Sequence, residues 1–153
     1  MINAVELAPD FRPRPIRHVL MDWDGTTALS RAGWGDLMTD VYVENLPFLE
    51  GEAADAMRAF AWDELMRLNG RPAIHQMAHL ADLVRARGGQ PLEALHYQGE
   101  FQRRLGEVVT SRLEAIRNGV ATADSLLVPG VRALFQELRG RGIACVPSRV
   151  VLR

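Results

Sequence analysis

Two aspartates, Asp22 and Asp24, stand two residues apart directly after a short apolar run, and Gly25 follows them. Two carboxylates this close after a buried strand are costly without a counter-charge, and a divalent cation that prefers hard oxygen ligands, such as Mg²⁺, is the natural one. The chemistry that fits is phosphoryl transfer to a carboxylate. Asp22 would attack phosphorus, while Asp24 would protonate the leaving alcohol and later deprotonate the hydrolytic water. The alternative interpretation is a turn in which Asp and Gly only cap and redirect the chain.

The residues after the two aspartates extend this candidate site. Gly25 permits a sharp exit from the strand, and Thr26 adds a hydroxyl and backbone N–H groups beside the carboxylates, so both are candidate phosphate ligands. Farther on, Arg31 could meet a substrate phosphate or carboxylate, and Trp34 could form a wall of the pocket. For these last two the alternatives are a surface arginine and a core tryptophan.

The elements that must position these residues have an α/β pattern. Val19, Leu20 and Met21 form a continuous apolar run, which predicts a strand covered on both faces in a parallel sheet. The aspartates then fall at the carboxyl end of that strand, where open α/β sheets bind ligands. Near the other end of the sequence, a helix from Pro129 and a strand from Ile143 complete a βαβ pattern. The predicted inner face of that helix comprises Val131, Leu134, Phe135 and Leu138.

Between residues 33 and 119 the apolar spacing is helical throughout, with no strand pattern. It predicts helices over Asp36–Asn45, over Glu52–Asn69, from Pro72 to Gly88, and from Pro91 to Asn118. The apolar face of the third helix comprises Ile74, Met77, Ala78, Ala81 and Val84, and that of the fourth Leu105, Val109, Leu113 and Ile116. His75 and His79 share a helix face, but no third ligand is evident, so surface or packing roles are favoured over a metal site.

The run DWDGTT at positions 22–27 resembles the first motif, DxDGT, of the haloacid dehalogenase superfamily of phosphatases and phosphotransferases. The segment from Val128 to Gly142 looks like the one that leads into the family's second strand. The helical middle resembles the α-helical cap of the phosphoglycolate phosphatase and β-phosphoglucomutase branch. The resemblance implies a partial Rossmann-like core over residues 1–30 and 121–153, with a helical cap over 31–120.

The resemblance also implies roles for individual residues. Asp22 would be the nucleophile and a Mg²⁺ ligand. Asp24 would be the general acid/base, with its backbone carbonyl on the metal. Ser148 is the candidate for the phosphate-binding residue of the family's second motif. A second, acid/base aspartate favours an oxygen leaving group over a halide, so a phosphatase or phosphotransferase acting on a small phosphorylated metabolite is the implied activity.

Two later motifs of the family have no counterpart here. All 18 residues counted as Lys or Arg are arginines, so no lysine neutralises the transferring phosphate, and no acidic pair follows on a later strand. We therefore expect this chain to be the N-terminal part of such a hydrolase, produced by truncation or by a shift of the reading frame near Val146. The alternative function is a catalytically incomplete fragment or a non-enzymatic interaction module on the same fold. A plain helical-bundle binding protein leaves DWDGTT unexplained and ranks last.

Composition excludes several other classes. The formal net charge is −1 and 48% of residues are hydrophobic, which is an ordinary balance for a soluble globular protein. Basic residues are scattered without a stripe, so no nucleic-acid partner is expected. No signal peptide or membrane-spanning run is evident, and the single Cys145 fits a reducing cytoplasm. The identity of the substrate and the oligomeric state do not follow from the sequence.

Overall fold

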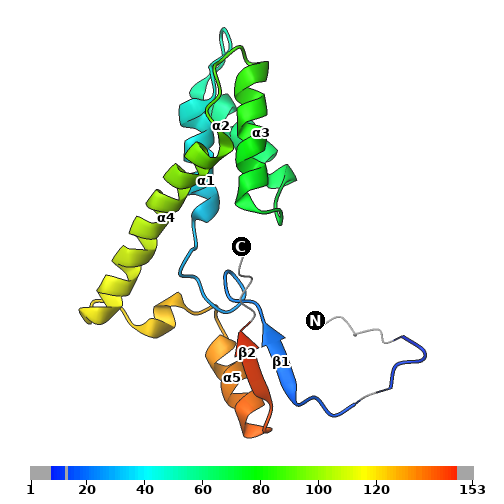
Figure 1. Ribbon diagram of the computed structural model, residues 1–153. Coiled ribbons are helices and arrows are strands. Elements are labelled where there is room, and N and C mark those ends of the chain that lie inside the picture. Colours follow the sequence, from blue (N-terminus) through cyan, green and yellow to red (C-terminus); the bar gives the residue numbers. More distant parts are fainter. Residues whose placement is uncertain (1–7, 13, 148–153) are drawn as a thin grey trace.

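The computed structural model describes residues 8–12 and 14–147, which fold as a mixed α/β protein (Figure 1). Its elements, in chain order, are β1 (His18–Met21), α1 (Trp34–Asn45), α2 (Ala54–Arg67), α3 (Ala73–Ala86), α4 (Ala94–Arg117), a short 3-10 helix η1 (Ala123–Leu126), α5 (Val131–Gly140) and β2 (Ala144–Pro147). The predicted helices and both predicted strands are present, with bounds that differ by a few residues. Residues 34–117 contain helices and no strand, as predicted.

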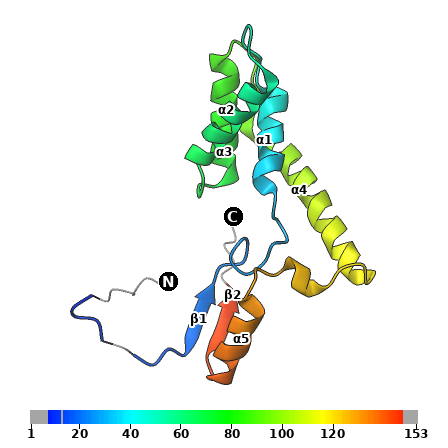
Figure 2. The same ribbon diagram turned by 180° about the vertical axis from the view of Figure 1, so that it is seen from behind.

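The two strands form one parallel sheet in which His18 lies opposite Ala144 and Met21 lies opposite Pro147. All the helices belong to the crossover between them, and α5 is the helix that packs against β2 (Figures 1 and 2). The prediction of a strand covered on both faces is wrong for the described residues, because Leu20 is 71% exposed. The apolar run correctly predicts the strand, but α1–α4 lie away from the sheet and leave it half covered.

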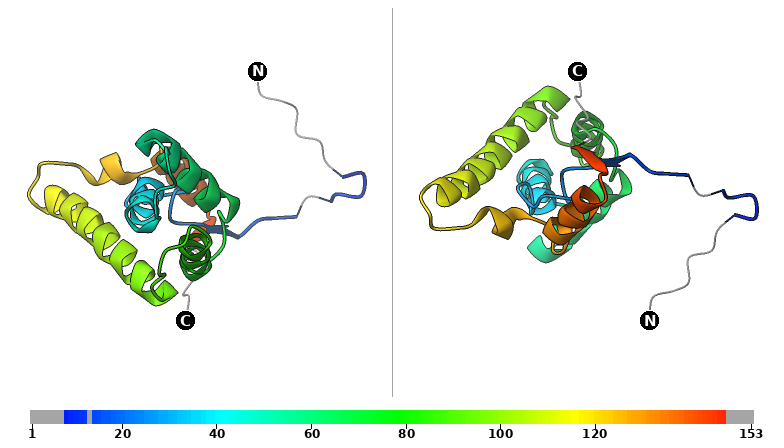
Figure 3. Two further views of the ribbon diagram at one scale, coloured as in Figure 1. Left: turned by 90° about the horizontal axis from the view of Figure 1, so that it is seen from above. Right: turned by 90° about the horizontal axis from the view of Figure 1, so that it is seen from below.

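The hydrophobic core lies among α1, α2, α3 and α4, which together form the helical group. α1 packs against α2 and α4, and α3 packs against α4; Figure 3 shows this group from above and from below. Its buried members are Met38, Val41, Tyr42, Leu46, Met57, Ala61, Leu65, Met77, Leu80, Val84, Tyr97, Phe101 and Leu105. The Tyr42 hydroxyl donates a 2.6 Å hydrogen bond to the Gln76 carbonyl and so joins α1 to α3 inside this core. Burial raises the pKa of Tyr42 well above its usual value, and the nearby charge of Glu64 adds to the effect.

The predicted inner face of α4 is only partly correct. Leu105 is buried as expected, but Leu113 is 42% exposed. The other buried residues on this helix are Tyr97 and Phe101, which lie nearer its N-terminus. The 24-residue α4 is much longer than its partners, so its C-terminal half extends beyond them (Figure 1). Periodicity identifies the apolar face of a helix, but not how far along it a partner extends.

The predicted faces of α3 and α5 need similar corrections. In α3, Met77 and Val84 are buried as expected, but Ala78 is exposed and the unpredicted Leu80 is fully buried. In α5, Val131 is buried while Leu134 is exposed. Leu134 is exposed because α5 packs against β2 alone, and a strand of four residues cannot cover the whole apolar face of the helix.

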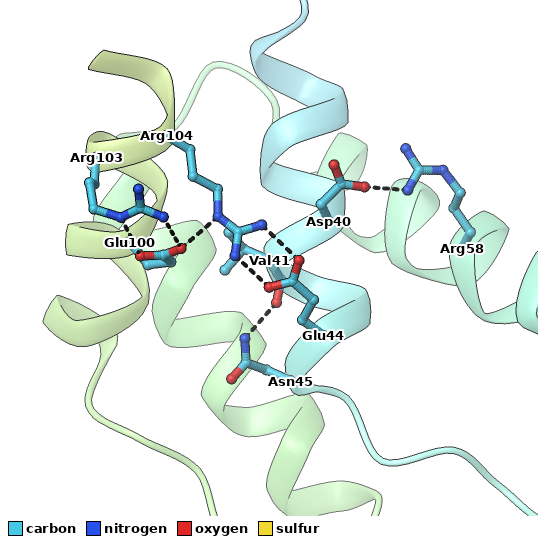
Figure 4. A network of polar contacts seen from close by, with 8 residues as sticks. All are labelled: Asp40, Val41, Glu44, Asn45, Arg58, Glu100, Arg103 and Arg104. Carbon is cyan, nitrogen blue, oxygen red and sulfur yellow. Dashed lines mark hydrogen bonds and ion pairs between the residues drawn. The ribbon is translucent and has the colours of Figure 1, made fainter. Parts of the chain in front are cut away.

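Ion pairs tie α1 to its two neighbouring helices (Figure 4). Arg104 of α4 donates to Glu44 of α1 and to Glu100 of its own helix, and Arg103 also donates to Glu100. Arg58 of α2 pairs with Asp40 of α1 in the same way. Hydrogen bonds from Arg103 and Arg104 lower the pKa of Glu100 to about 2.

Two connecting segments link the helices to the strands and run side by side. Ala28 pairs with Leu127 in an antiparallel bridge, and the Leu29 amide donates to the Leu126 carbonyl at 2.7 Å. Arg112 of α4 donates to the Ser30 carbonyl at 2.8 Å. The position of the helical group relative to the loop after β1 is therefore set by backbone pairing and by one arginine.

Within the part of the chain that the structure describes, no helix combines the length and the apolarity needed to cross a membrane.

Candidate active site

The loop after β1 is a tight turn built by its own backbone. Gly25 has a positive φ of 75°, a conformation that favours glycine. The Ala28 amide donates to the Trp23 carbonyl at 2.8 Å, and the Gly25 amide donates to the Ala28 carbonyl at 2.8 Å. The buried Thr27 hydroxyl donates to the Asp22 carbonyl at 3.0 Å. The predicted sharp exit at Gly25 is confirmed, and the turn fixes the backbone of both aspartates.

Each aspartate carboxylate has a different partner. The Thr26 hydroxyl donates to Asp22 Oδ2 at 3.1 Å, so Thr26 lies beside a carboxylate as expected. Arg31 Nη1 donates to Asp24 Oδ2 at 3.0 Å, and both of these side chains are more than two-fifths exposed. For Asp22 and for Asp24, the second carboxylate oxygen has no hydrogen bond within the described residues. Each carboxylate is thus oriented by one contact and keeps one oxygen available.

A pocket of about 820 Å³ lies next to this turn. Asp24, Arg31 and Trp34 line it. Trp34 also packs against the hydrophobic core, so it combines the two roles that the sequence left open. Of the other predicted site residues, Asp22, Gly25 and Thr26 belong to the same turn but do not line the pocket. Ser148 lies outside the described residues.

The remaining walls come from the helical group, and sequence reasoning did not identify them as site residues. The turn between α2 and α3 and the first turn of α3 contribute Asn69, Gly70, Arg71, Pro72, Ala73, Ile74, His75 and Gln76. α1 contributes Met38, and α4 contributes Leu95, Gln98, Phe101 and Gln102. The polar run Asn69-Gly70-Arg71 between two amphipathic helices is the one signal in the sequence that marks this region as a loop. Nothing in the spacing relates that loop to Asp24.

The two histidines of α3 have separate environments. His79 Nε2 lies 2.8 Å from Oε2 of the nearly buried Glu64 on α2 and so takes part in packing between the helices. His75, one turn earlier, is exposed and lines the pocket. Residues 8–12 and 14–147 contain no group of three or more His, Cys, Asp or Glu side chains that could hold a metal ion.

Two donor groups at the turn nevertheless have the chemistry that Mg²⁺ prefers. The Asp22 carboxylate is exposed, and the Asp24 carbonyl accepts no hydrogen bond from any described residue. Both are hard oxygen ligands, and Mg²⁺ in phosphoryl-transfer sites commonly takes one or two carboxylates while water and substrate phosphate complete its shell. These two groups are the ones that would hold the ion.

No protein-family model matches this chain, and no curated protein or solved structure is significantly similar to it. Its function must therefore be inferred from its residues and their geometry.

Proposed function

We propose that this protein is a Mg²⁺-dependent phosphatase or phosphotransferase of the haloacid dehalogenase type that acts on a small phosphorylated metabolite. The observation that carries the proposal is the position of Asp22 and Asp24. They follow a parallel strand directly, in a turn held by backbone hydrogen bonds, beside a pocket large enough for a metabolite.

In the first chemical step, Asp22 attacks phosphorus through its free carboxylate oxygen. The bond between phosphorus and the ester oxygen breaks, and protonated Asp24 gives its proton to the leaving alkoxide. In the second step Asp24 takes a proton from water, and the water oxygen attacks phosphorus of the aspartyl-phosphate. The bond between phosphorus and the Asp22 oxygen breaks, so phosphate leaves, the Asp22 carboxylate is restored and Asp24 is again protonated. The Thr26 contact at 3.1 Å orients Asp22 for the attack.

When bound, Mg²⁺ would neutralise charge on the phosphoryl oxygens. The Asp22 carboxylate and the Asp24 carbonyl are its proposed ligands among the described residues. Arg31 is the proposed cation for the phosphate, since the chain contains no lysine and Arg31 lies 3.0 Å from Asp24 at the pocket. Gly25 and Thr26 are proposed to approach the phosphate through the turn, and Ser148 remains a candidate from the sequence.

The proposal includes the domain division and the fold expected from the resemblance. Residues 1–30 and 121–153 would form part of a Rossmann-like core, and residues 31–120 would form a helical cap that excludes water from the site. Two observations support this division. The main cluster of buried apolar side chains comes from α1–α4 and from Leu46 directly after α1, and the connecting segments that flank this group pair with each other at Ala28 and Leu127. The single Cys145 supports a reducing, cytoplasmic setting.

The test is hydrolysis of p-nitrophenyl phosphate with Mg²⁺ and with EDTA. We expect turnover that requires Mg²⁺ and falls by a factor on the order of 10³ or more in Asp22→Asn, because the nucleophile is lost. Asp24→Asn should lose a factor of roughly 10² to 10⁴. Asp82→Asn is the matched control, since Asp82 is exposed on α3 and pairs with Arg85 outside the pocket.

Equal turnover in the wild type and in Asp22→Asn would overturn the proposed mechanism. No turnover by the folded wild-type chain would overturn the proposed activity and favour the non-enzymatic module, which the missing lysine already makes the second candidate.

A further inference from the structure

We infer that a groove between α1 and α2 binds the arginine-rich segment that precedes β1 in a second copy of this chain. The groove has a volume of about 390 Å³, and Trp62 and Asp63 of α2 belong to its lining. The basic residues of the segment are Arg12, Arg14 and Arg17. The contact is an association between two copies of the protein, so it does not depend on the proposed enzymatic activity.

An indole ring supplies the apolar surface of the groove. Trp62 is 40% exposed. Its ring lies against the backbone of α1, because a Cβ added at Gly35 would lie 3.0 Å from the ring carbon Cζ3 of Trp62. The ring is therefore held from one side while part of it remains exposed in the groove. An exposed indole suits a guanidinium, which stacks on its face and is attracted by its π electrons.

Two carboxylates beside this ring have no cation next to them. The groove is lined by Asp36, Thr39, Asp55, Arg58, Ala59, Trp62 and Asp63. Arg58 is already neutralised, since it lies 2.5 Å from Asp40 and 3.7 Å from Asp36. Within the described residues, neither Asp55 nor Asp63 takes part in an ion pair. The groove therefore attracts a cation, and an arginine can use the carboxylates and the indole together.

The segment before β1 carries the opposite charge. Residues 8–12 and 14–17 contain neither helix nor strand and are exposed, and Figure 1 shows them leading away from the rest of the molecule. They include three arginines and one acidic residue, Asp10. In the part of the chain that the structure describes, none of these arginines takes part in an ion pair. Pro15 restricts Arg14 to an extended backbone, which lowers the entropy lost on binding.

Length and direction identify a second copy as the source of the segment. Asp55 and Asp63 are eight residues apart on α2, which is about 12 Å along the helix axis. The arginines span residues 12–17, about 17 Å in an extended chain, so two of them can meet both carboxylates. The segment joins β1 at the end away from the helical group, as Figures 1 and 2 show. A reciprocal exchange of segments between two copies closes as a two-fold dimer.

Sedimentation velocity on the full chain tests this inference. We expect a dimer with a Kd on the order of 10⁻⁵ M at about 50 mM salt, weakened roughly tenfold at about 500 mM salt because the contact is ionic. One double variant is Arg12→Glu with Arg14→Glu, and the other is Asp55→Arg with Asp63→Arg. Each should be monomeric alone, because like charges then face each other. An equimolar mixture of the two should form a heterodimer, because opposite charges meet again at both contacts.

The matched control is Arg117→Glu with Arg139→Glu. It changes the net charge as much as the first double variant does, at two exposed residues outside the groove, and should associate like the wild type. Thermal melting of each variant establishes that it is folded. The inference is overturned if the wild type stays monomeric up to about 1 mM. It is also overturned if either double variant associates as strongly as the wild type, or if their mixture stays monomeric.

Discussion

At the scale of single residues, the candidate site depends on two short side-chain contacts. Thr26 holds one oxygen of Asp22, and Arg31 holds one oxygen of Asp24. Both contacts leave the opposite oxygen of the carboxylate available for chemistry. Orientation of this kind contributes to catalysis by keeping the reacting atom near its target, and it contributes little to stability at an exposed site.

Thr26→Val should therefore reduce kcat/KM by about tenfold, because Asp22 loses the hydroxyl that orients it. Thr26→Ser keeps the hydroxyl and should retain most of the activity. Since Thr26 is exposed, thermal melting of both variants should match the wild type within about 0.5 kcal/mol. Equal activity of Thr26→Val and Thr26→Ser would show that the hydrogen bond from Thr26 to Asp22 does not contribute to kcat/KM.

At the scale of elements, what a helix buries depends on the length of its partners. Leu80 of α3 lies fully inside the helical core, whereas Leu113 near the end of α4 is 42% exposed. Both belong to amphipathic helices, so periodicity treats them alike. Truncation of the two side chains should change the free energy of unfolding by different amounts, because only the removal of Leu80 would leave a cavity.

Leu80→Ala should lower the free energy of unfolding by roughly 2–5 kcal/mol. Leu113→Ala should change it by about 0.5 kcal/mol. Urea denaturation of the two variants at one pH measures both values. If Leu113→Ala costs as much as Leu80→Ala, the C-terminal half of α4 has a partner that the described residues do not include.

The ion pairs of Glu100 with Arg103 and Arg104, all within α4, lead to a pH prediction. Arg103 and Arg104 lower the pKa of Glu100 to about 2, below the value of about 4.3 expected in the unfolded chain. A lowered folded-state pKa contributes stability above the unfolded value, and this contribution is lost as the pH falls from about 5 to about 2.

Glu100→Gln should therefore show a shallower loss of stability than the wild type in urea denaturation between pH 6 and pH 3. Glu114→Gln, an exposed substitution on the same helix, is the matched control and should follow the wild-type curve. Identical curves for Glu100→Gln and the wild type would contradict the contribution of this network.

At the scale of the whole molecule, a few contacts decide where the helical group lies relative to the turn that carries Asp22 and Asp24. The segments around Ala28 and Leu127 pair as a short antiparallel bridge. Arg112 connects α4 to the carbonyl of Ser30, next to Arg31. Because the pocket has walls from both parts, its shape depends on these connections.

Arg112→Ala should lower kcat/KM by about tenfold while leaving the helical core intact, because Arg112 contacts the connecting segment rather than the core. Hydrogen exchange should become faster in residues 27–33 and stay unchanged in α2 and α3. Arg117→Ala, which removes an exposed arginine of the same helix, provides the comparison. Unchanged exchange and activity in Arg112→Ala would mean that backbone pairing alone sets the arrangement.

The sequence by itself determined the local features of this protein. The helices, both strands and the turn at Gly25 follow from periodicity, from prolines at helix starts and from a glycine with positive φ, all of which act within a few residues. The pair of aspartates beside Thr26 is local in the same sense, so the motif could be identified without coordinates.

Only the tertiary structure decided which surfaces face that motif. Three such features are the exposure of Leu20, the burial of Leu80, and the placement of Arg71 and His75 on the same pocket as Asp24. Each depends on contacts between different elements rather than within one element. Apolar spacing specifies which side of an element is apolar, and it carries no information about which distant element covers that side. The turn with the two aspartates could therefore be predicted from the sequence, whereas the far wall of the adjacent pocket could not.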